Sequence, residues 1–534
     1  MFLTLNVMSN KMPFVISEES SRTIGRDAQR NNILAARAVA DIVKTTLGPK
    51  GMDKMLVDRD GNITVTNDGV TILEEIEIEH PAARMMIEIA KTQEREVGDG
   101  TTTAVLLAGK LLERAEYLIE KKIHPTVIVK GYKEAAERAI GILDELSIQI
   151  ENFDILKQIA KTAMTGKGPE DNKEILSGLI IEAVDQIAKG REANIDDVKI
   201  EKIYGSSVAK SEIVYGMILN KERVNKEMPL SVLNAKILLI DFPLEIKNPE
   251  KETKIEVNSV EQLQSFIESE EKYLRELGEK IFNIGANVVF CQKGIDDVAQ
   301  YYLAKLGIFA CRRVAKSDME KLAKSTSGKI ISNINDINEE QLGKAEKVEE
   351  IKEGSEFLIY IRGCDNPKMV SLIIRGSTPH VVDEAQRAVK DGLGDVISAV
   401  KLGRIVAGGG AVEIELARRL RIFSKTKTGK EQLAVEEFAN ALECIPEILA
   451  ENAGMDPIDI ITELKKRHDG GFAREGINLF EDKIEDTLSA GIVEPLKVKT
   501  QAIESASEVA TLILRVDDVL ISQRKKDLIS KEID

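Results

Sequence analysis

The hydrophobic pattern of the chain changes twice along its length, and this division constrains the fold more than any single motif. From about Asp27 to Leu146, apolar residues recur at helical spacing, as in "AQRNNILAARAVADIVKTTLG". The same pattern returns from about Gly403 to Leu520, in stretches such as "QLAVEEFANALECIPEILAENAG". Gly48–Pro49 and Gly454 predict the ends of two of these helices. Two helical regions of one character therefore flank a segment of another kind.

The middle segment, from about Lys210 to Val370, alternates short apolar runs with helical stretches. The runs "AKILLIDFPLEI", "ANVVFCQ", "GIFACRRV" and "EFLIYIRG" are typical of strands. This alternation predicts a separate α/β domain. Because 534 residues exceed one ordinary core, we predict a multidomain protein of α and α/β character. The polar stretch "LEIKNPEKETKIEV" within the middle segment is expected to project from it.

Composition narrows the class of protein. The formal charge of -16 opposes a broad basic surface, so nucleic acid is not expected as a partner. Hydrophobic residues reach 43% although aromatic residues make up only 4%, which predicts an aliphatic core. No apolar run approaches the ~18 residues of a membrane span, and the four scattered cysteines suit reduced thiols. We therefore expect a cytoplasmic protein without a membrane partner.

The stretch "GDGTTTAVLLAGKLL", which starts at Gly98, looks like a phosphate-binding loop that lacks a lysine. Gly98 and Gly100 allow close backbone approach, and a helix that begins near Thr101 offers free N–H groups to an anion. The hydroxyl groups of Thr101, Thr102 and Thr103 add further donors. The stretch does not match the Walker A pattern, so positive charge must come from elsewhere.

Asp99 supplies one answer, since a carboxylate beside phosphate oxygens is repulsive unless a cation bridges them. Mg²⁺ is typically held by one or two carboxylates together with phosphate oxygens. A Gly-Asp-Gly sequence before a helix is also typical of ordinary turns and helix caps. The loop alone leaves both interpretations open.

Three further glycine-containing stretches place flexible backbone beside regular elements. They are "TTLGPKG", "TNDGVTIL" and "VAGGGAVEIELARRL". Gly408 to Gly410 can pack against a ligand or against another backbone, and their sequence does not separate the two. The residues around Asp60–Gly61 predict a hairpin, "KMLVDRDGNITVTNDG", which has little of its own to bury and must pair with something else.

Five motifs, in this order and at these separations, carry a resemblance to a known family. They are "GPKGMDKMLVD", "NDGVTIL", "GDGTTT", "ANVVFCQKGIDD" and "VAGGGAVE". Together they resemble the group II chaperonins, and most closely the archaeal thermosome subunits, over about Pro13 to Ser522. Each motif is weak alone, and their shared register is what makes the resemblance specific.

The resemblance implies a mainly helical equatorial ATPase domain with small β-hairpins, a small mixed intermediate domain, and an inserted α/β apical domain with a helical protrusion. The implied bounds are 1–148 and 403–534 for the equatorial domain, 149–212 and 369–402 for the intermediate domain, and 213–368 for the apical domain, with a lid protrusion at about 244–283. This arrangement accounts for the shared character of the two helical regions.

The resemblance also assigns roles to residues, with ATP and Mg²⁺ as ligands. Asp391 in "RAVKDGLGDV" matches the hydrolytic aspartate, and Asp68 in "TNDG" matches a second aspartate near the metal. Asp99 matches the Mg²⁺ ligand. The nucleotide-binding positions are Leu47, Gly48 and Pro49 in the first loop, Gly100, Thr101, Thr102 and Thr103 in the phosphate cradle, Lys167 in the γ-phosphate-sensing loop, Gly409 and Gly410 on the adenosine side, and Asn478 and Glu494 beside the base and ribose.

Without the resemblance, several of these residues have simpler interpretations. Asp391 would be one helix-surface acid among 90 acidic residues, and Asp68 an ordinary turn residue. Lys167 and Glu494 would be solvated loop residues. Beside Asp391, Gly392 departs from the alanine usual in the family, and glycine costs ~1 kcal/mol in a helix interior. This departure puts the rate of hydrolysis in question but not the binding of nucleotide.

The resemblance predicts an ATP-driven folding machine that encloses non-native polypeptides in a chamber with a built-in lid. It implies identical or homologous subunits in two stacked rings of about eight, since closed symmetry is the rule for such assemblies. The hairpin would add to a neighbouring subunit's sheet. Two alternatives stay open: a scaffold that binds nucleotide but barely hydrolyses it, and a phosphotransferase in which Asp391 activates a small-molecule hydroxyl group.

Overall fold

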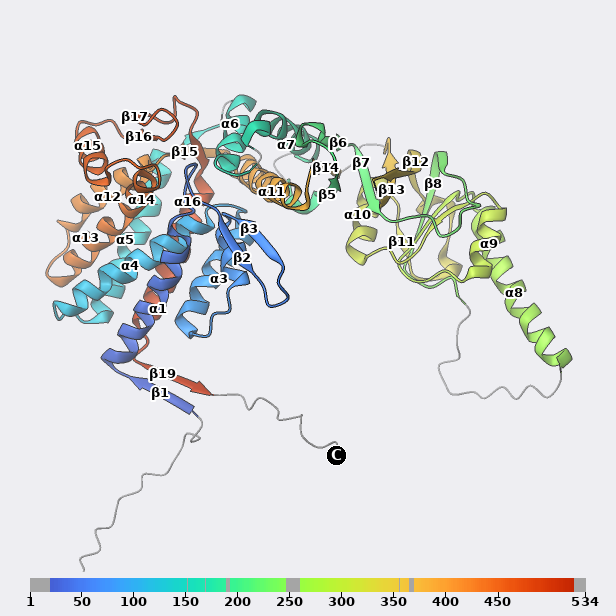
Figure 1. Cartoon of the computed structure of the whole chain (residues 1–534), viewed down its shortest axis with the longest axis horizontal. Helices are drawn as coiled ribbons and strands as arrows, with labels where there is room; N and C mark the ends of the chain where they lie inside the picture. The colour runs from blue at the N-terminus through green and yellow to red at the C-terminus, as the bar shows by residue number, and fades with distance from the viewer. Residues whose placement is uncertain are drawn as a thin grey trace, which may run out of the picture.

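The computed structural model describes residues 20–150, 152–168, 170–188, 193–245, 260–354, 356–364 and 369–522. Three bodies follow one another along the long axis of the molecule (Figure 1). A helical body lies at one end, a small mixed body in the middle, and an α/β body at the other end. The multidomain α and α/β class predicted from the sequence is therefore confirmed.

The helical body is built from both ends of the chain. Its core is a single aliphatic cluster in which Ile33 and Val43 of the first helix join Ile503 and Ile513 of the last. The helices are α1 (Arg26–Lys44), α2 (Gly69–Glu75), α3 (Pro81–Glu96), α4 (Thr101–Glu120), α5 (Pro125–Leu146), α12 (Ala411–Ser424), α13 (Lys430–Leu442), α14 (Cys444–Asn452), α15 (Pro457–Asp469) and α16 (Leu496–Leu514).

Small sheets join the two ends of the chain within this body. Strand β1 (Ser20–Ile24) pairs antiparallel with β19 (Asp518–Ser522). Strand β15 (Arg404–Ala407) lies between β4 (Ile148–Gln149) and β18 (Val493–Pro495), and β16 (Glu475–Asn478) forms a hairpin with β17 (Lys483–Asp486).

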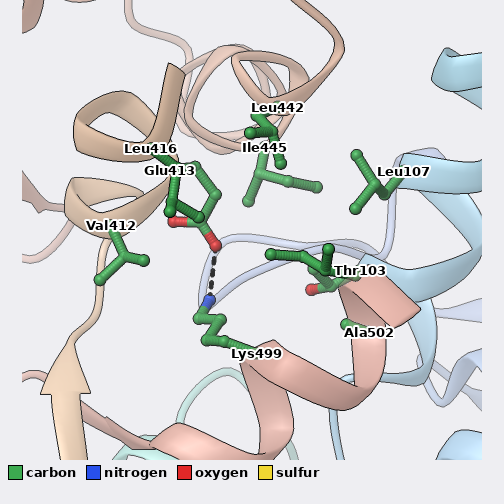
Figure 2. Close-up of a pocket in the computed structure, with 10 residues that line it drawn as sticks. Thr103, Leu107, Val412, Glu413, Leu416, Leu442, Ile445, Lys499 and Ala502 are labelled. Atoms are coloured by element: carbon green, nitrogen blue, oxygen red, sulfur yellow. Dashed lines mark ion pairs between the residues drawn. The ribbon is translucent and has the colours of Figure 1, made fainter. Parts of the chain in front are cut away.

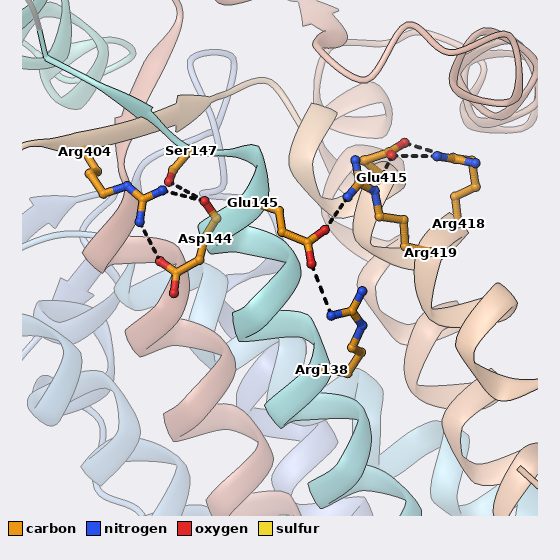
Figure 3. Close-up of polar contacts among 8 residues, drawn as sticks. All are labelled: Arg138, Asp144, Glu145, Ser147, Arg404, Glu415, Arg418 and Arg419. Atoms are coloured by element: carbon orange, nitrogen blue, oxygen red, sulfur yellow. Dashed lines mark hydrogen bonds and ion pairs between the residues drawn. The ribbon is translucent and has the colours of Figure 1, made fainter. Parts of the chain in front are cut away.

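Ion pairs reinforce the junction between α5 and the C-terminal segment (Figure 3). Arg404 binds Asp144 at 3.1 Å, and Arg419 binds Glu145 at 2.9 Å. Glu145 also pairs with Arg138 on its own helix. These contacts fix the end of α5 against β15 and α12, which follow it by more than two hundred residues in the sequence.

Two predicted helix ends differ from the structure. Helix α1 stops at Lys44, and the residues up to Gly48 form a turn, closed by the Thr46 N–H that donates to the Val43 carbonyl at 3.1 Å. The stretch expected to be one helix before Gly454 is divided into α13 and α14 at Glu443. Pro446 explains the division, because it has no N–H group to continue the hydrogen-bond ladder across this point.

The hairpin expected around Asp60–Gly61 is present as β2 (Lys54–Val57) and β3 (Ile63–Thr66). Asp58 closes its turn by accepting the backbone N–H groups of Asp60 and Asn62 at 2.9 and 2.8 Å. Met55 and Val57 are 69% and 64% exposed. Within the described chain these two strands form a sheet of their own, which leaves both edges free.

The middle body consists of two chain segments that flank the α/β body in the sequence. Its sheet has β14 (Val370–Gly376) between β5 (Val198–Tyr204), which is parallel to it, and β6 (Glu212–Val214), which is antiparallel. Helices α6 (Phe153–Met164), α7 (Lys173–Ile187) and α11 (Pro379–Leu402) pack together beside it. Their shared core is again aliphatic.

The α/β body is a sheet of order β10-β9-β8-β12-β13-β7, with β11 paired to β8. Separate apolar clusters cover the sheet, and one of them contains helix α8. The elements are β7 (Gly216–Asn220), β8 (Ser231–Ile240), α8 (Val260–Asn283), β9 (Val288–Cys291), α9 (Asp297–Lys305), β10 (Phe309–Cys311), α10 (Lys316–Thr326), β11 (Ile330–Ile331), β12 (Gly343–Glu353) and β13 (Glu356–Arg362).

Of the predicted protrusion, residues 246–259 lie outside the described residues, whereas α8 that follows them is present. Figure 1 shows α8 extending well beyond the rest of the α/β body. All four cysteines are buried, and in the described parts of the chain they form no disulfide bond with one another. None of the helices in the described ranges is long and apolar enough to cross a membrane.

Candidate functional site

The loop before α4 has the backbone that the sequence predicted for a phosphate cradle. Gly98 and Gly100 have φ angles of +92° and +77°, which favour glycine. A Cβ atom on Gly100 would lie 2.7 Å from Cγ1 of Val498, so a larger residue does not fit there. Gly100 caps α4, and the first N–H groups of that helix and the hydroxyls of Thr101 to Thr103 can therefore serve an anion.

Asp68 lies directly beside this cradle. It caps α2, and its carboxylate accepts the N–H of Thr71 at 3.0 Å and the hydroxyl of Thr71 at 2.6 Å. A Cβ atom on Gly69 would lie 2.6 Å from Oγ1 of Thr102. The starts of α2 and α4 are thus in contact, and Asp68 is held at their junction.

Asp391 and Lys167 form a buried ion pair beside these loops. Their side chains are 10% and 18% exposed. Burial raises the pKa of Asp391 well above its usual range; Lys167 opposes this effect, and the negative charge of Asp99 reinforces it. Burial lowers the pKa of Lys167, but Asp391 and Asp99 outweigh it, so the ammonium stays charged. The negative charges of Asp99 and Asp68 act to raise the pKa of both members of the pair.

A close backbone contact brings Asp391 to the cradle. A Cβ atom on Gly394 would lie 2.7 Å from the Val97 carbonyl oxygen and 3.0 Å from Cα of Gly98. Helix α11 therefore touches the loop at the turn that follows Asp391. Gly392 faces elsewhere: α11 continues unbroken through it, and a Cβ atom there would meet Cδ1 of Ile180 at 2.8 Å.

The loop that carries Lys167 also contacts the other predicted loops. A Cβ atom on Gly166 would lie 2.5 Å from Cα of Pro49. The side-chain amide of Asn67 donates to the Gly166 carbonyl at 2.9 Å. Gly48, with a φ of +84°, packs against Leu449, and the carbonyl of Leu47 accepts a hydrogen bond from Asn452 at 2.9 Å. The first loop, the Asp68 turn and the Lys167 loop thus meet.

Gly409 and Gly410 connect β15 to α12 with φ angles of +64° and +77°. Both approach other backbone closely: a Cβ atom on Gly409 would lie 2.6 Å from the Ile477 carbonyl oxygen, and one on Gly410 would lie 3.1 Å from Cα of Pro446. Asn478 follows Ile477, and its side-chain oxygen accepts the N–H of Phe480 at 3.0 Å. These glycines therefore serve backbone packing, one of the two interpretations of the sequence, and they bring Asn478 beside the start of α12.

Glu494 belongs to a charged cluster that joins the two sides of the site. Lys499 of α16 binds Glu494 and Glu413, each at 2.8 Å, and is only 6% exposed. Figure 2 shows Lys499 reaching Glu413 across a cavity of about 10 Å³ that Thr103 of the cradle also lines. The cluster thus connects α16 to α12 and β18, next to a cavity that the cradle helix α4 also lines.

Sequence reasoning missed Lys499 and Glu413, and it also missed Asp395. Asp395 is 3% exposed, and the neighbouring charge of Asp99 and burial together raise its pKa well above the usual range. Asp395 follows Asp391 by four residues and so shares a helix face with it, but this spacing alone gives no sign of burial. Nothing in the sequence distinguishes such buried acids from surface acids.

The carboxylates of the site suit a divalent cation shared with phosphate. Among the described residues, no three His, Cys, Asp or Glu side chains form a ready-made metal cage. Mg²⁺ does not require one, because it is usually held by one or two carboxylates, phosphate oxygens and water. Asp99 at the cradle and the buried Asp395 Oδ1, which has no hydrogen-bond partner, are groups that such a cation would satisfy.

Comparison with known proteins gives the family. The model of the TCP-1/cpn60 chaperonin family matches residues 39–524. The chain belongs to this chaperonin family. It is 54% identical to a thermosome subunit of Methanopyrus kandleri over 515 residues, which cover 95% of this chain and 94% of that protein.

Two further archaeal relatives show the same degree of similarity. A thermosome subunit beta of Archaeoglobus fulgidus is 54% identical, with 95% of this chain and 94% of that protein covered. A thermosome subunit of Methanocaldococcus jannaschii is 51% identical, with 96% and 95% covered. The resemblance to group II chaperonins is confirmed. The chaperonin also has the convergent loops that a nucleotide site requires, although the roles of individual residues stay predictions.

Replacing Lys499 by methionine should destabilise this chaperonin, because Glu413 and Glu494 would lose their shared cation in a buried place. We expect a loss of about 3–5 kcal/mol in the free energy of unfolding, measured by denaturant titration. Lys497→Met on the same helix, whose ammonium binds Gln501 at 3.0 Å, is the matched control and should cost at most about 0.5 kcal/mol. Equal denaturant midpoints of unfolding for Lys499→Met and Lys497→Met would contradict the structural role of Lys499.

Proposed function

We propose that this chaperonin subunit hydrolyses ATP and uses the cycle to enclose non-native polypeptides in a ring chamber with a built-in lid. One observation carries the proposal: the Lys167–Asp391 ion pair lies where α11 contacts the Gly98 loop before α4 and where the Lys167 loop contacts the Asp68 turn. A lysine, several carboxylates and a helix N-terminus suit the phosphates of a nucleotide with its cation.

The residues can divide the chemistry of phosphoryl transfer among them. Hydrolysis depends chiefly on positioning and charge, so the central task is to orient a water molecule toward the γ-phosphate. Asp391 is suited to this task because its carboxylate is buried and held by Lys167. Lys167 can exchange this partner for a phosphate oxygen, which would leave Asp391 free to accept a proton from water. Mg²⁺ held at Asp99 would supply charge neutralisation.

Helix α11 offers the means to couple hydrolysis to movement. It belongs to the middle body, and its N-terminus follows β14 of that body's sheet. A small apolar cluster, in which Ile203 and Ile373 of the middle sheet join Ile218 and Tyr360 of the α/β sheet, connects this body to the next. A shift of α11 toward bound nucleotide would thus be passed to the α/β body. ATP binding would close the chamber, and hydrolysis would allow it to reopen.

Ring formation is supported by the β2–β3 hairpin. Its exposed Met55 and Val57 and its free edges suit addition to the sheet of a second copy of the chain or of a homologous subunit. Repetition of this contact about one axis would give a closed ring, and the proposed two stacked rings of about eight subunits rest on the likeness to thermosome subunits.

Client binding is supported by exposed apolar side chains of the α/β body. Large apolar groups at a surface suit transient contact with unfolded chains. The side chains concerned are those of Leu230 (56% exposed), Leu233 (66%), Tyr273 (41%), Phe282 (51%) and Tyr301 (49%). Non-native polypeptides are the proposed clients.

Asp391→Ala should leave ATP binding intact and slow hydrolysis at least about 100-fold, because water loses its orienting carboxylate. Asp99→Ala should instead weaken Mg²⁺-dependent nucleotide binding about tenfold or more. Nucleotide affinity from calorimetry and phosphate release from single-turnover assays separate the two effects. Wild-type turnover by Asp391→Ala would remove the catalytic assignment.

Gly394→Ala should slow hydrolysis about 10- to 100-fold, because its Cβ atom would force α11 away from Gly98 and misplace Asp391. The matched control is Gly392→Ala, whose Cβ atom meets only the flexible end of Ile180. This control should keep turnover within about threefold, with α11 stabilised by up to about 1 kcal/mol. If Gly392→Ala instead increases turnover by much more than threefold, the result would support the alternative in which the wild-type chain is a nucleotide-binding scaffold and Gly392 slows its hydrolysis.

Electron microscopy of the purified protein, with and without ATP and aluminium fluoride, tests the whole proposal. Closed double rings that form only with nucleotide are expected. Met55→Asp combined with Val57→Asp should prevent ring formation while the subunit keeps its helical content, because charge replaces the apolar side chains of the hairpin. Rings that never close would favour a passive nucleotide-binding scaffold, and a monomeric wild type would contradict the assembly.

A further inference from the structure

Asp395 is a buried acid that the proposed catalytic scheme does not use. It lies on α11 one turn after Asp391, on the same face of the helix. The contact of Gly394 with Gly98 presses this turn against the loop that contains Asp99. Asp395 and Asp99 directly follow these two glycines in the chain, so the contact brings the two acids side by side.

The surroundings of Asp395 contain more negative than positive charge. The negative charges of Asp99 and Glu494 act on it, and Lys167 supplies the positive charge that opposes them. Lys167 is already bound by Asp391, and Lys499 by Glu494. Burial of a carboxylate without a paired cation costs free energy, so a proton or a cation is expected between Asp395 and Asp99.

The second carboxylate oxygen of Asp395 distinguishes a shared proton from a bound cation. In the part of the chain that the structure describes, Oδ1 of Asp395 is buried and has no hydrogen-bond partner. A single proton shared with Asp99 would satisfy only the oxygen that faces Asp99. A hydrated divalent cation would satisfy both, because Mg²⁺ keeps several of its water molecules and these can donate to Oδ1.

We propose that Asp395 is a second carboxylate of the cation site at Asp99, so that this chaperonin binds a divalent cation before nucleotide arrives. The inference rests on the proposed function for the role of the cation, but its test needs no nucleotide. Asp395 would act on the cation directly or through one of its water molecules. Because Asp395 and Asp391 are on one helix, the cation would also link α11 to the cradle.

The experiment is a Mn²⁺ titration of the assembled, chelator-treated protein without nucleotide, in which free Mn²⁺ is followed by electron paramagnetic resonance. Asp395→Asn, which keeps the shape of the side chain, should weaken Mn²⁺ binding at least about tenfold. Asp395→Val should do the same, and it guards against an effect peculiar to the amide. Glu94→Gln is the matched control, since it removes a different acid near Asp391 that is paired with Lys390 at 2.6 Å, and it should change the affinity at most about threefold.

Thermal unfolding provides the second readout. Without metal, Asp395→Val should unfold at a temperature equal to or above that of the wild type, because an unpaired buried charge is gone. Added Mn²⁺ should raise the unfolding temperature of the wild type more than that of the variant. Mn²⁺ affinity in Asp395→Asn equal to that in Glu94→Gln would overturn the proposal, whatever the ATPase activity. A cation site dependent on Asp395 in a protein that hydrolyses no ATP would uphold it and reject the catalytic function alone.

Discussion

The backbone contact between Gly394 and Gly98 sets the position of nearly every charged group in the site. Helix α11 comes from the middle body, and the Gly98 loop belongs to the helical body, so the site exists only where these two bodies touch. A Cβ atom on Gly394 would lie 2.7 Å from the Val97 carbonyl oxygen, and one on Gly98 would lie 3.0 Å from Cα of Gly394, so a side chain at either glycine would force the two backbones apart. The charges of Asp391, Asp395 and Asp99 are therefore brought together because neither Gly394 nor Gly98 carries a side chain.

This arrangement explains why so much charge can be buried in an aliphatic protein. Lys167 and Lys499 each neutralise a carboxylate from a distant part of the chain, and Lys499 is nearly inaccessible to water, whereas the Lys167 side chain is 18% exposed. Such pairs contribute little net stability compared with apolar packing, since desolvation offsets most of the attraction. Their value lies in geometry, because each lysine fixes two segments in register around the cradle.

Hydrophobic periodicity predicted two helical regions around an α/β segment, whereas the small middle body was implied only by the resemblance to a family. The hairpin was predicted from Asp60–Gly61. The sequence placed helix ends less well, since the local turn after Lys44 and the effect of Pro446 depend on packing. Asp391 was found only because five motifs in register resembled a family. Asp395 and Lys499 were missed because burial, which makes them distinctive, depends on which helices meet, and no local pattern records that.

Strand β1 pairs with β19, and one core joins Ile33 to Ile513. These contacts between the two ends of the chain determine the order in which its parts can fold during synthesis. The N-terminal helices leave the ribosome long before the C-terminal helices that cover them are made. The α/β body, by contrast, forms its sheet from a continuous stretch of chain and can complete it first. During its own synthesis the chain therefore exposes aliphatic helix faces that later helices will cover. Each new subunit is thus, for a time, a non-native polypeptide of the kind that a chaperonin binds.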